Sequence, residues 1–379
     1  MNDLENYKAI LENHFGAGSA TFNTMTGTTN LIIGALNHTQ FVPFRTAFGK
    51  RLERLNALYS ISDSNRKNLI DRANDIATAN NWDGAYAELV AFDFLNSNLD
   101  YSSLINLSKT VPASATLAGG LGMSNVNLDG YYDDFDVWFD VKALGDKSRD
   151  ILDGIIRDAK KNLGIPTVVI SPEYSLDLDY ELFQKHRRAL LAELENGINV
   201  ASQTAYIKST VIPELAFRLM WQGGVLAAIS TYDPYGHAEN HHKLLFTYAK
   251  KFSLTSPTLI VSVIFPWFSE SVVQQTDSSE IFYRSLCRRF FCQYAKDSNP
   301  AKTILTKFQG NESLSQVTDK LSGVLFLEDT SLTSTDSAAQ NVKAYAYLNP
   351  NAAHKVSRHF RDYLSSLRFF VDDFANDNY

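Results

Sequence analysis

The clearest pattern of hydrophobic and polar positions lies between residues 135 and 142. Apolar Phe135, Val137, Phe139 and Val141 alternate there with Asp136, Trp138, Asp140 and Lys142. Such strict alternation predicts a β-strand with one apolar face. Residues 128–132 are expected to form a second strand, and Asp133-Asp134 suits a two-residue hairpin turn. Asp129 then lies opposite Trp138 and shares the face of Asp140.

A helix with a buried acid is predicted before this hairpin. Residues 83–95 (D-G-A-Y-A-E-L-V-A-F-D-F-L) form a strong helical pattern, and Asp83 is suited to cap the helix. Glu88 falls in the middle of the apolar stripe, beside Leu89 and Phe92. Because an unpaired buried carboxylate is costly, Glu88 is expected to have a charged partner, a hydrogen-bond network or a metal ion nearby, unless it extends to the helix edge.

The remaining patterns predict an α/β protein. Residues 1–80 are mainly helical, and the basic residues of the helix at 45–60 are expected to form a solvated face, with phosphate contact as the alternative. From residue 83 the order is helix, three strands, helix and strand, with the last three elements at 135–142, 148–163 and 165–170. Beyond residue 171 we expect strands at 203–210, 224–231, 258–265, 323–327 and 344–348, and helices at 180–194, 237–251, 280–295 and 353–370. These elements either extend the first sheet or form their own layer.

Composition places the chain among soluble globular proteins. Its 379 residues allow two or three domains, and 45% hydrophobic with 20% charged residues describes neither a disordered nor a membrane protein. The formal net charge of −7 argues against a protein that coats nucleic acid through bulk charge, but it permits an enzyme with a basic cleft. No secretory signal is evident at the start, so a cytoplasmic location is expected, with Cys287 and Cys292 as reduced thiols.

Two carboxylates and a lysine on one hairpin face have a specific chemical use. Carboxylate oxygens suit Mg²⁺, which can polarise a phosphate and lower the pKa of bound water. The residues resemble the motif of the PD-(D/E)XK, or restriction-endonuclease-like, nuclease superfamily. Asp129 matches the first acid and Asp140-Val141-Lys142 matches the D-X-K triplet, with ten residues between the aspartates. The residue before the first acid is Leu128 instead of the proline of the motif.

This resemblance implies a fold and an activity. A nuclease core of αβββαβ order with a central mixed sheet is expected at 81–175, between a helical region at 1–80 and an additional α/β region of unknown role at 176–379. The implied activity is Mg²⁺-dependent hydrolysis of phosphodiester bonds, with Mn²⁺ as a substitute, by a DNA endonuclease of restriction or phage-defence type. Its partners would be DNA and a further copy of the chain, in a homodimer or higher oligomer, and no membrane.

The resemblance also implies roles for individual residues. Asp129 and Asp140 would bind the metal, and Glu88 would bind it directly or through water, since helices before the hairpin supply such a glutamate in many members. Lys142 would position the attacking water. Asp136 is the reserve metal ligand, because it lies on the same face of the predicted strand.

Other interpretations stay open. A non-catalytic nucleic-acid-binding or assembly protein could retain the fold. His237 and His241 are four residues apart on a predicted helix, a spacing that suits a transition-metal site in a metallohydrolase. Arg284, Arg288 and Arg289 lie among phenylalanines and could follow a nucleic-acid backbone, although amphipathic packing is the commoner role. Neither a phosphate-binding glycine motif nor a nucleophile elbow is present.

Overall fold

The chain folds as two compact units in the computed structural model, Met1–Leu144 with His242–Tyr379 and Gly145–His241. The structure describes residues 3–22, 30–77, 82–97, 104–145, 147–165, 168–173, 180–200, 205–220, 234–266, 279–334, 341–375 and 377. The predicted α/β class is confirmed, since helices flank a seven-stranded mixed sheet in the first unit.

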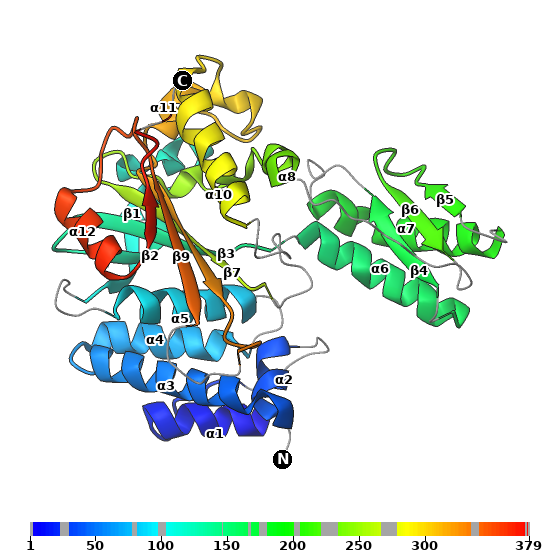
Figure 1. Cartoon of the computed structure of the whole chain (residues 1–379), viewed down its shortest axis with the longest axis horizontal. Helices are drawn as coiled ribbons and strands as arrows, with labels where there is room; N and C mark the ends of the chain where they lie inside the picture. Colours follow the sequence, from blue (N-terminus) through cyan, green and yellow to red (C-terminus); the bar gives the residue numbers. More distant parts are fainter. Residues whose placement is uncertain are drawn as a thin grey trace. The chain divides into compact units, whose positions relative to one another are not determined.

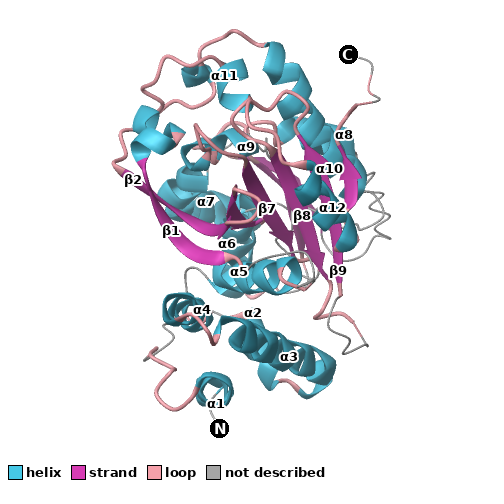
Figure 2. Ribbon diagram, turned by 90° about the vertical axis from the view of Figure 1, so that its left-hand side faces the viewer, coloured by secondary structure: helices cyan, strands magenta, loops and turns pink. Residues whose placement is uncertain are grey.

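The sheet of the first unit joins strands that are far apart in the sequence (Figure 2). Its order is β1 (Asn106–Pro112), β2 (Asn125–Tyr132), β3 (Val137–Ala143), β7 (Thr258–Ile264), β8 (Gly323–Asp329), β9 (Val342–Leu348) and β10 (Phe370–Asp372). The first three strands form an antiparallel meander, and β3, β7 and β8 are parallel. Strand β9 is antiparallel to β8 and parallel to β10, so the sheet is mixed as predicted.

The two central strands are covered on both faces. Every residue of β7 (T-L-I-V-S-V-I) and of β8 (G-V-L-F-L-E-D) is buried. Continuous apolar runs of this length are typical of interior strands of a parallel sheet, and a strand was predicted at 258–265. The predicted region at 176–379 therefore contributes strands to the sheet of the hairpin, and it does not form only a separate layer.

Helices from the N-terminal third cover one face of this sheet. They are α1 (Asp3–Phe15), α2 (Leu31–Asn37), α3 (Val42–Tyr59), α4 (Asp63–Asp75) and α5 (Trp82–Leu95). Figure 1 shows α1, α3, α4 and α5 stacked one above another, and α5 contacts β3 and β7. From Ala85 to Leu95 every residue of α5 is buried, because this helix lies between the sheet and the other helices.

A buried ion pair corrects one expectation for α3. Arg51 was assigned to a solvated basic face, but it is only 5% exposed. Its Nε lies 3.3 Å from Asp93 Oδ2 on α5, and its Nη1 donates to the Tyr86 hydroxyl at 2.9 Å. The basic residues of this helix were all assigned to one solvated face, although Arg51 points inward.

The other face of the sheet carries α10 (Ser279–Arg288), whose Tyr283 ring stacks on Phe326 of β8 with centroids 4.1 Å apart. Shorter helices complete the unit: α9 (Leu244–Thr247), η4 (Ala249–Lys251), α11 (Leu314–Thr318) and α12 (Arg358–Ser366). The helix predicted at 237–251 is therefore several short helices. The cause is a break in the helical pattern around residues 241–243, which form a turn.

The second unit is a small α/β structure. Its sheet has the antiparallel order β4 (Val169–Glu173), β6 (Ala216–Met220) and β5 (Ala205–Lys208). Helices α6 (Lys147–Leu163) and α7 (Tyr180–Val200) share a hydrophobic core with this sheet, and α8 (Pro234–Asn240) also belongs to the unit. The strand predicted at 224–231 lies outside the described residues.

The division into units differs from the predicted segments. The strand expected at 165–170 is found at 169–173, where it pairs with β6 and not with the hairpin strands. The position beside β3 in the large sheet is occupied by β7 instead. The predicted 81–175 core thus crosses a unit boundary after Leu144, and the predicted 176–379 region is divided between both units.

Candidate functional site

The hairpin register brings the two aspartates opposite each other. Strands β2 and β3 pair Tyr132 with Val137 and Gly130 with Phe139. The connecting turn is residues 133–136, so the expectation of a two-residue turn was wrong. In this longer turn Asp129 is in register with Asp140 instead of Trp138. The ladder ends one residue before this pair, and Asp129 and Asp140 interact electrostatically where the two strands separate.

The two strands separate at this point. Their main-chain pairing ends at Gly130 and Phe139, whereas β3 continues to pair with β7 as far as Ala143. The Asp129 side chain enters the opening, and its Oδ2 accepts a hydrogen bond of 2.8 Å from the Val141 N–H. Gly130 is required beside it, since a Cβ there would overlap the ring of Phe139.

Asp140 is fully buried and is held by two lysines. Lys142 Nζ contacts its Oδ2, and Lys251 Nζ lies 2.7 Å from its Oδ1. Lys251 belongs to η4 and also donates to the main-chain oxygen of Asn127 on β2. The Lys142 ammonium lies 5.9 Å from the centre of the Tyr248 ring, within cation–π range. The Lys142 side chain is 29% exposed, so the site is accessible to solvent through this residue.

Glu88 has the charged partner that its buried position predicted. The residue is 8% exposed, and Arg72 Nε of α4 lies 2.6 Å from its Oε2. Arg72 also forms an ion pair of 3.0 Å with Asp75. The side chain of Glu88 interacts electrostatically with Asp129, Asp140 and Lys142. A helix in front of the hairpin therefore contributes an acid to the same region.

Mutual repulsion and burial shift the pKa values of these acids. Burial raises the pKa of Glu88 to about 8, Asp129 adds to the increase, and Arg72 opposes it. Burial likewise raises the pKa of Asp129 to about 6, with Asp140 adding to it and Lys142 opposing it. Burial alone would lower the pKa of Lys142, but Asp140 and the other acids raise it overall. The three carboxylates therefore lie close enough to disfavour each other's charge.

We call this group the carboxylate cluster. It consists of three acids and three cations, namely Glu88, Asp129 and Asp140 with Arg72, Lys142 and Lys251. Its formal charge is zero when all six side chains are ionised. Two elements of the helical layer, two hairpin strands and the short helix η4 supply these residues.

The carboxylate oxygens of Glu88, Asp129 and Asp140 are suitable ligands for a hard divalent cation. Their present spacing, however, does not form a complete set of ligands. Among the described residues, no group of three or more His, Cys, Asp or Glu side chains is arranged to hold a metal ion. Glu88 Oε2 and both Asp140 oxygens are buried and accept no hydrogen bond beyond their ion pairs. Such carboxylate oxygens are the ligands that Mg²⁺ prefers. Asp140 could accept an ion only after one ammonium group moves.

Several other predicted residues lie apart from the cluster. Asp136 is in the hairpin turn with a φ of 50°, and not on the strand face, so its assignment as reserve ligand was wrong. Its carboxylate accepts hydrogen bonds from Tyr131 at 3.0 Å and from Ser256 at 3.2 Å. Of the histidine pair, the His237 side chain lies outside the described residues, and His241 follows the end of α8.

The arginines of α10 are engaged by the C-terminal segment. Arg284 Nε lies 2.7 Å from Asp372 Oδ2, and Arg288 Nε lies 2.8 Å from Asp377 Oδ2. Arg284 also contacts Asp377 at 2.5 Å. These partners already neutralise two of the arginines that were considered for nucleic-acid contact.

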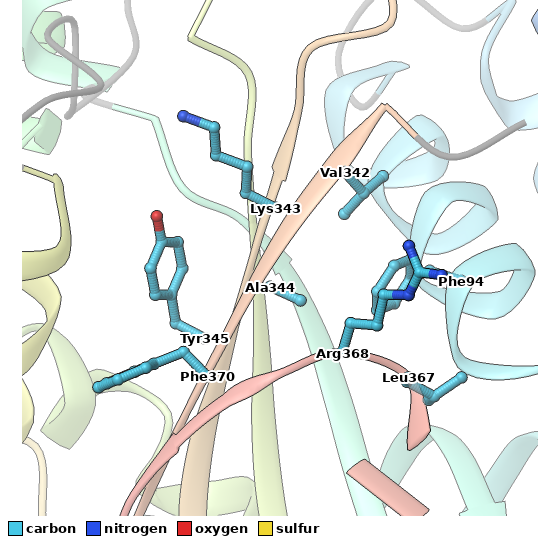
Figure 3. Close-up of a pocket in the computed structure, with 8 residues that line it drawn as sticks. All are labelled: Phe94, Val342, Lys343, Ala344, Tyr345, Leu367, Arg368 and Phe370. Carbon is cyan, nitrogen blue, oxygen red and sulfur yellow. The ribbon is translucent and has the colours of Figure 1, made fainter. Parts of the chain in front are cut away.

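A pocket of about 290 Å³ lies beside β9 and β10, apart from the cluster (Figure 3). Its lining combines aromatic and basic side chains, with Phe94, Val342, Lys343, Ala344, Tyr345, Leu367, Arg368 and Phe370. It shares no residue with the carboxylate cluster. The chemistry predicted for the hairpin therefore does not extend into this pocket.

Sequence reasoning missed Lys251. It was placed at the end of a predicted helix and given no role, because its contact depends on β7 pairing with β3. The Lys250-Lys251 pair shortly before a buried strand was the only local signal. Arg72 was likewise not predicted as the partner of Glu88.

No helix among the described residues combines the length and apolar character that crossing a bilayer requires. No protein-family model, no curated protein and no solved structure matches the chain.

Proposed function

We propose that the chain is a Mg²⁺-dependent nuclease that hydrolyses phosphodiester bonds in DNA, with the carboxylate cluster as its active site. The observation that carries the proposal is the meeting of Asp129 and Asp140 where β2 leaves β3, with Lys142 beside them and Glu88 from α5. Acids from a helix and a hairpin, together with the D-X-K lysine, are the residues that the PD-(D/E)XK resemblance requires.

The sheet supports a restriction-endonuclease-like core with changed boundaries. In this proposal the core comprises α5, β1, β2, β3 and β7, with β7, which lies parallel beside β3, in place of the strand predicted at 165–170. Residues 145–241 are then an insertion between the motif strand and the next core strand.

In the proposed mechanism the acids of the cluster hold the ion. Asp129 and Asp140 would be its ligands, and Glu88 would bind it directly or through water. A bound Mg²⁺ would supply Lewis-acid polarisation of the phosphate and a lower pKa for the attacking water. Burial and the charge of Asp129 raise the pKa of Glu88, which favours its protonated form while no ion is bound.

Lys142 has a separate role in this mechanism. Its ammonium would orient the attacking water and stabilise the negative charge that develops on the phosphate oxygens. Of the two lysines paired with Asp140, Lys142 has the more exposed side chain, at 29% against 13% for Lys251. A substrate would therefore contact Lys142 before Lys251. Asp140 keeps the Lys142 ammonium in place through their ion pair.

The proposed substrate is duplex DNA, in restriction or phage defence. Cutting both strands commonly uses two copies of one active site, so a homodimer or higher oligomer is part of the proposal. In this proposal Arg284 and Arg288 of α10 contribute little to DNA binding, because both are already paired with acids of the C-terminal segment.

Plasmid cleavage with Mg²⁺ or Mn²⁺ tests the activity. We expect the wild type to cut, and Asp140→Asn to lose roughly 100-fold or more in rate. Lys142→Met should lower kcat much more than it raises KM. Asp136→Asn is the matched control, because it makes the same chemical change on the same hairpin outside the cluster. Equal cleavage by all four proteins would remove these residues from the mechanism.

A non-catalytic nucleic-acid-binding or assembly protein is the second candidate. The charge balance of the cluster and the full burial of Asp140 favour it, because both are typical of a structural ion network. Calorimetry with Mg²⁺ separates the two candidates. Binding that is lost in Asp140→Asn supports the nuclease, and heat changes that are identical in both proteins support the structural network.

A further inference from the structure

Lys251 lies where a divalent cation would have to bind. Its Nζ is 2.7 Å from Asp140 Oδ1, and it donates a second hydrogen bond to the main-chain oxygen of Asn127. Asn127 is on β2 and Asp140 is on β3, so one ammonium group spans the opening between the separated strands. The Lys251 side chain is 13% exposed and Asp140 is fully buried, so water has little access to their ion pair.

We infer that Lys251 is the resident counter-cation of the site, and that a divalent cation must displace it from Asp140. The inference rests on the proposed function in one respect, since it takes Asp140 as a metal ligand. An ammonium and a divalent cation compete for the same carboxylate oxygen, because both need its lone pairs. Loss of a hydrogen bond between charged groups lowers the apparent affinity of the ion by roughly tenfold.

The position of Lys251 in the fold makes it the lysine that leaves. Lys142 is two residues from Asp140 on the same strand face, and it also interacts with Asp129 and Glu88. It therefore keeps negative partners when an ion binds. Lys251 comes from η4, outside the strand, so its side chain can move without changing β3.

Mn²⁺ titration of the full chain by calorimetry tests the displacement. Lys251→Met should bind Mn²⁺ about tenfold more tightly than the wild type, because the competing ammonium is gone. Lys251→Arg should stay near the wild type, since it keeps a cation at the carboxylate. Lys250→Met is the matched control, because it removes the same charge one residue away and should leave the affinity unchanged.

The Mn²⁺ affinities of these variants decide whether the ion displaces Lys251 from Asp140. Equal or weaker Mn²⁺ binding by folded Lys251→Met overturns the inference, and Lys251→Gln provides the comparison if the methionine variant does not fold. Tighter binding by both lysine-to-methionine variants also overturns it, since bulk charge would then be the cause. Tighter Mn²⁺ binding by Lys251→Met, together with no DNA cleavage by the wild type, supports displacement of Lys251 and refutes the nuclease proposal. Mn²⁺ binding by none of the proteins overturns both proposals.

Discussion

Val141 donates its main-chain N–H to the side chain of Asp129 on the neighbouring strand, across 2.8 Å. A continued antiparallel ladder would offer a main-chain carbonyl at this place. The carboxylate thus closes the end of the ladder where β2 leaves β3, and it satisfies a donor that would otherwise be lost inside the sheet. One residue of the proposed active site is therefore also a structural element of the hairpin.

This relationship predicts different results for two substitutions of Asp129. Asp129→Asn keeps an oxygen acceptor for Val141 and removes a charge that burial and Asp140 disfavour, so its stability should equal or exceed that of the wild type at pH 8. Asp129→Ala leaves the N–H without its acceptor and should be less stable than Asp129→Asn by about 1–3 kcal/mol. Urea denaturation measures both. Equal stability of the two variants would show that the hydrogen bond contributes nothing.

The buried arginine of α3 gives a second prediction. Asp93 accepts from Arg51 at 3.3 Å and from Arg54 at 2.6 Å, and Arg51 is 5% exposed. Asp93→Ala leaves the Arg51 charge with less compensation in the interior, so it should lower the free energy of unfolding by about 3–5 kcal/mol.

Arg54→Ala is the control for this prediction. The Arg54 side chain is 36% exposed, so its removal should change stability by at most about 1 kcal/mol. Thermal and urea denaturation of both variants would test the difference. A loss of similar size in both would mean that the pair at the surface, and not the buried one, stabilises the helices.

Local patterns in the sequence predicted the parts of the fold that depend on neighbouring residues. The alternation at 135–142 identified the strand, and Asp129 and Asp140 interact as expected although the predicted turn length was wrong. Because burying a carboxylate is costly, Glu88 was predicted to have a charged partner, a hydrogen-bond network or a metal ion nearby. Arg72 is such a charged partner. These inferences required only residues close together in the chain.

Pairing between distant strands could not be predicted in this way. The apolar runs predicted as strands at 165–170 and 258–265 gave no local indication of which one lies beside β3. That choice is made by the tertiary packing of the helices and strands around each run. The contact of Lys251 with Asp140 depends on the same choice, and so does the assignment of residues 145–241 to a separate unit.

The raised pKa of Glu88 makes stability depend on pH. Its pKa is about 8 in the folded chain against an ordinary value of 4.5, chiefly because of burial and the charge of Asp129. Between these two values the folded state holds a proton that the unfolded state has released. Stability must therefore fall as the pH rises from about 4.5 to about 8.

Glu88→Gln removes this dependence, because the amide stays neutral at every pH in the range. The variant should gain on the wild type by roughly 2–4 kcal/mol between pH 5 and pH 8, measured as the difference in free energy of unfolding. Asp71→Asn, which removes an exposed acid of α4, controls for the loss of one negative charge. A difference between Glu88→Gln and the wild type that stays constant with pH would show that Arg72 fully compensates the buried carboxylate, and that the like charges of the cluster do not oppose one another.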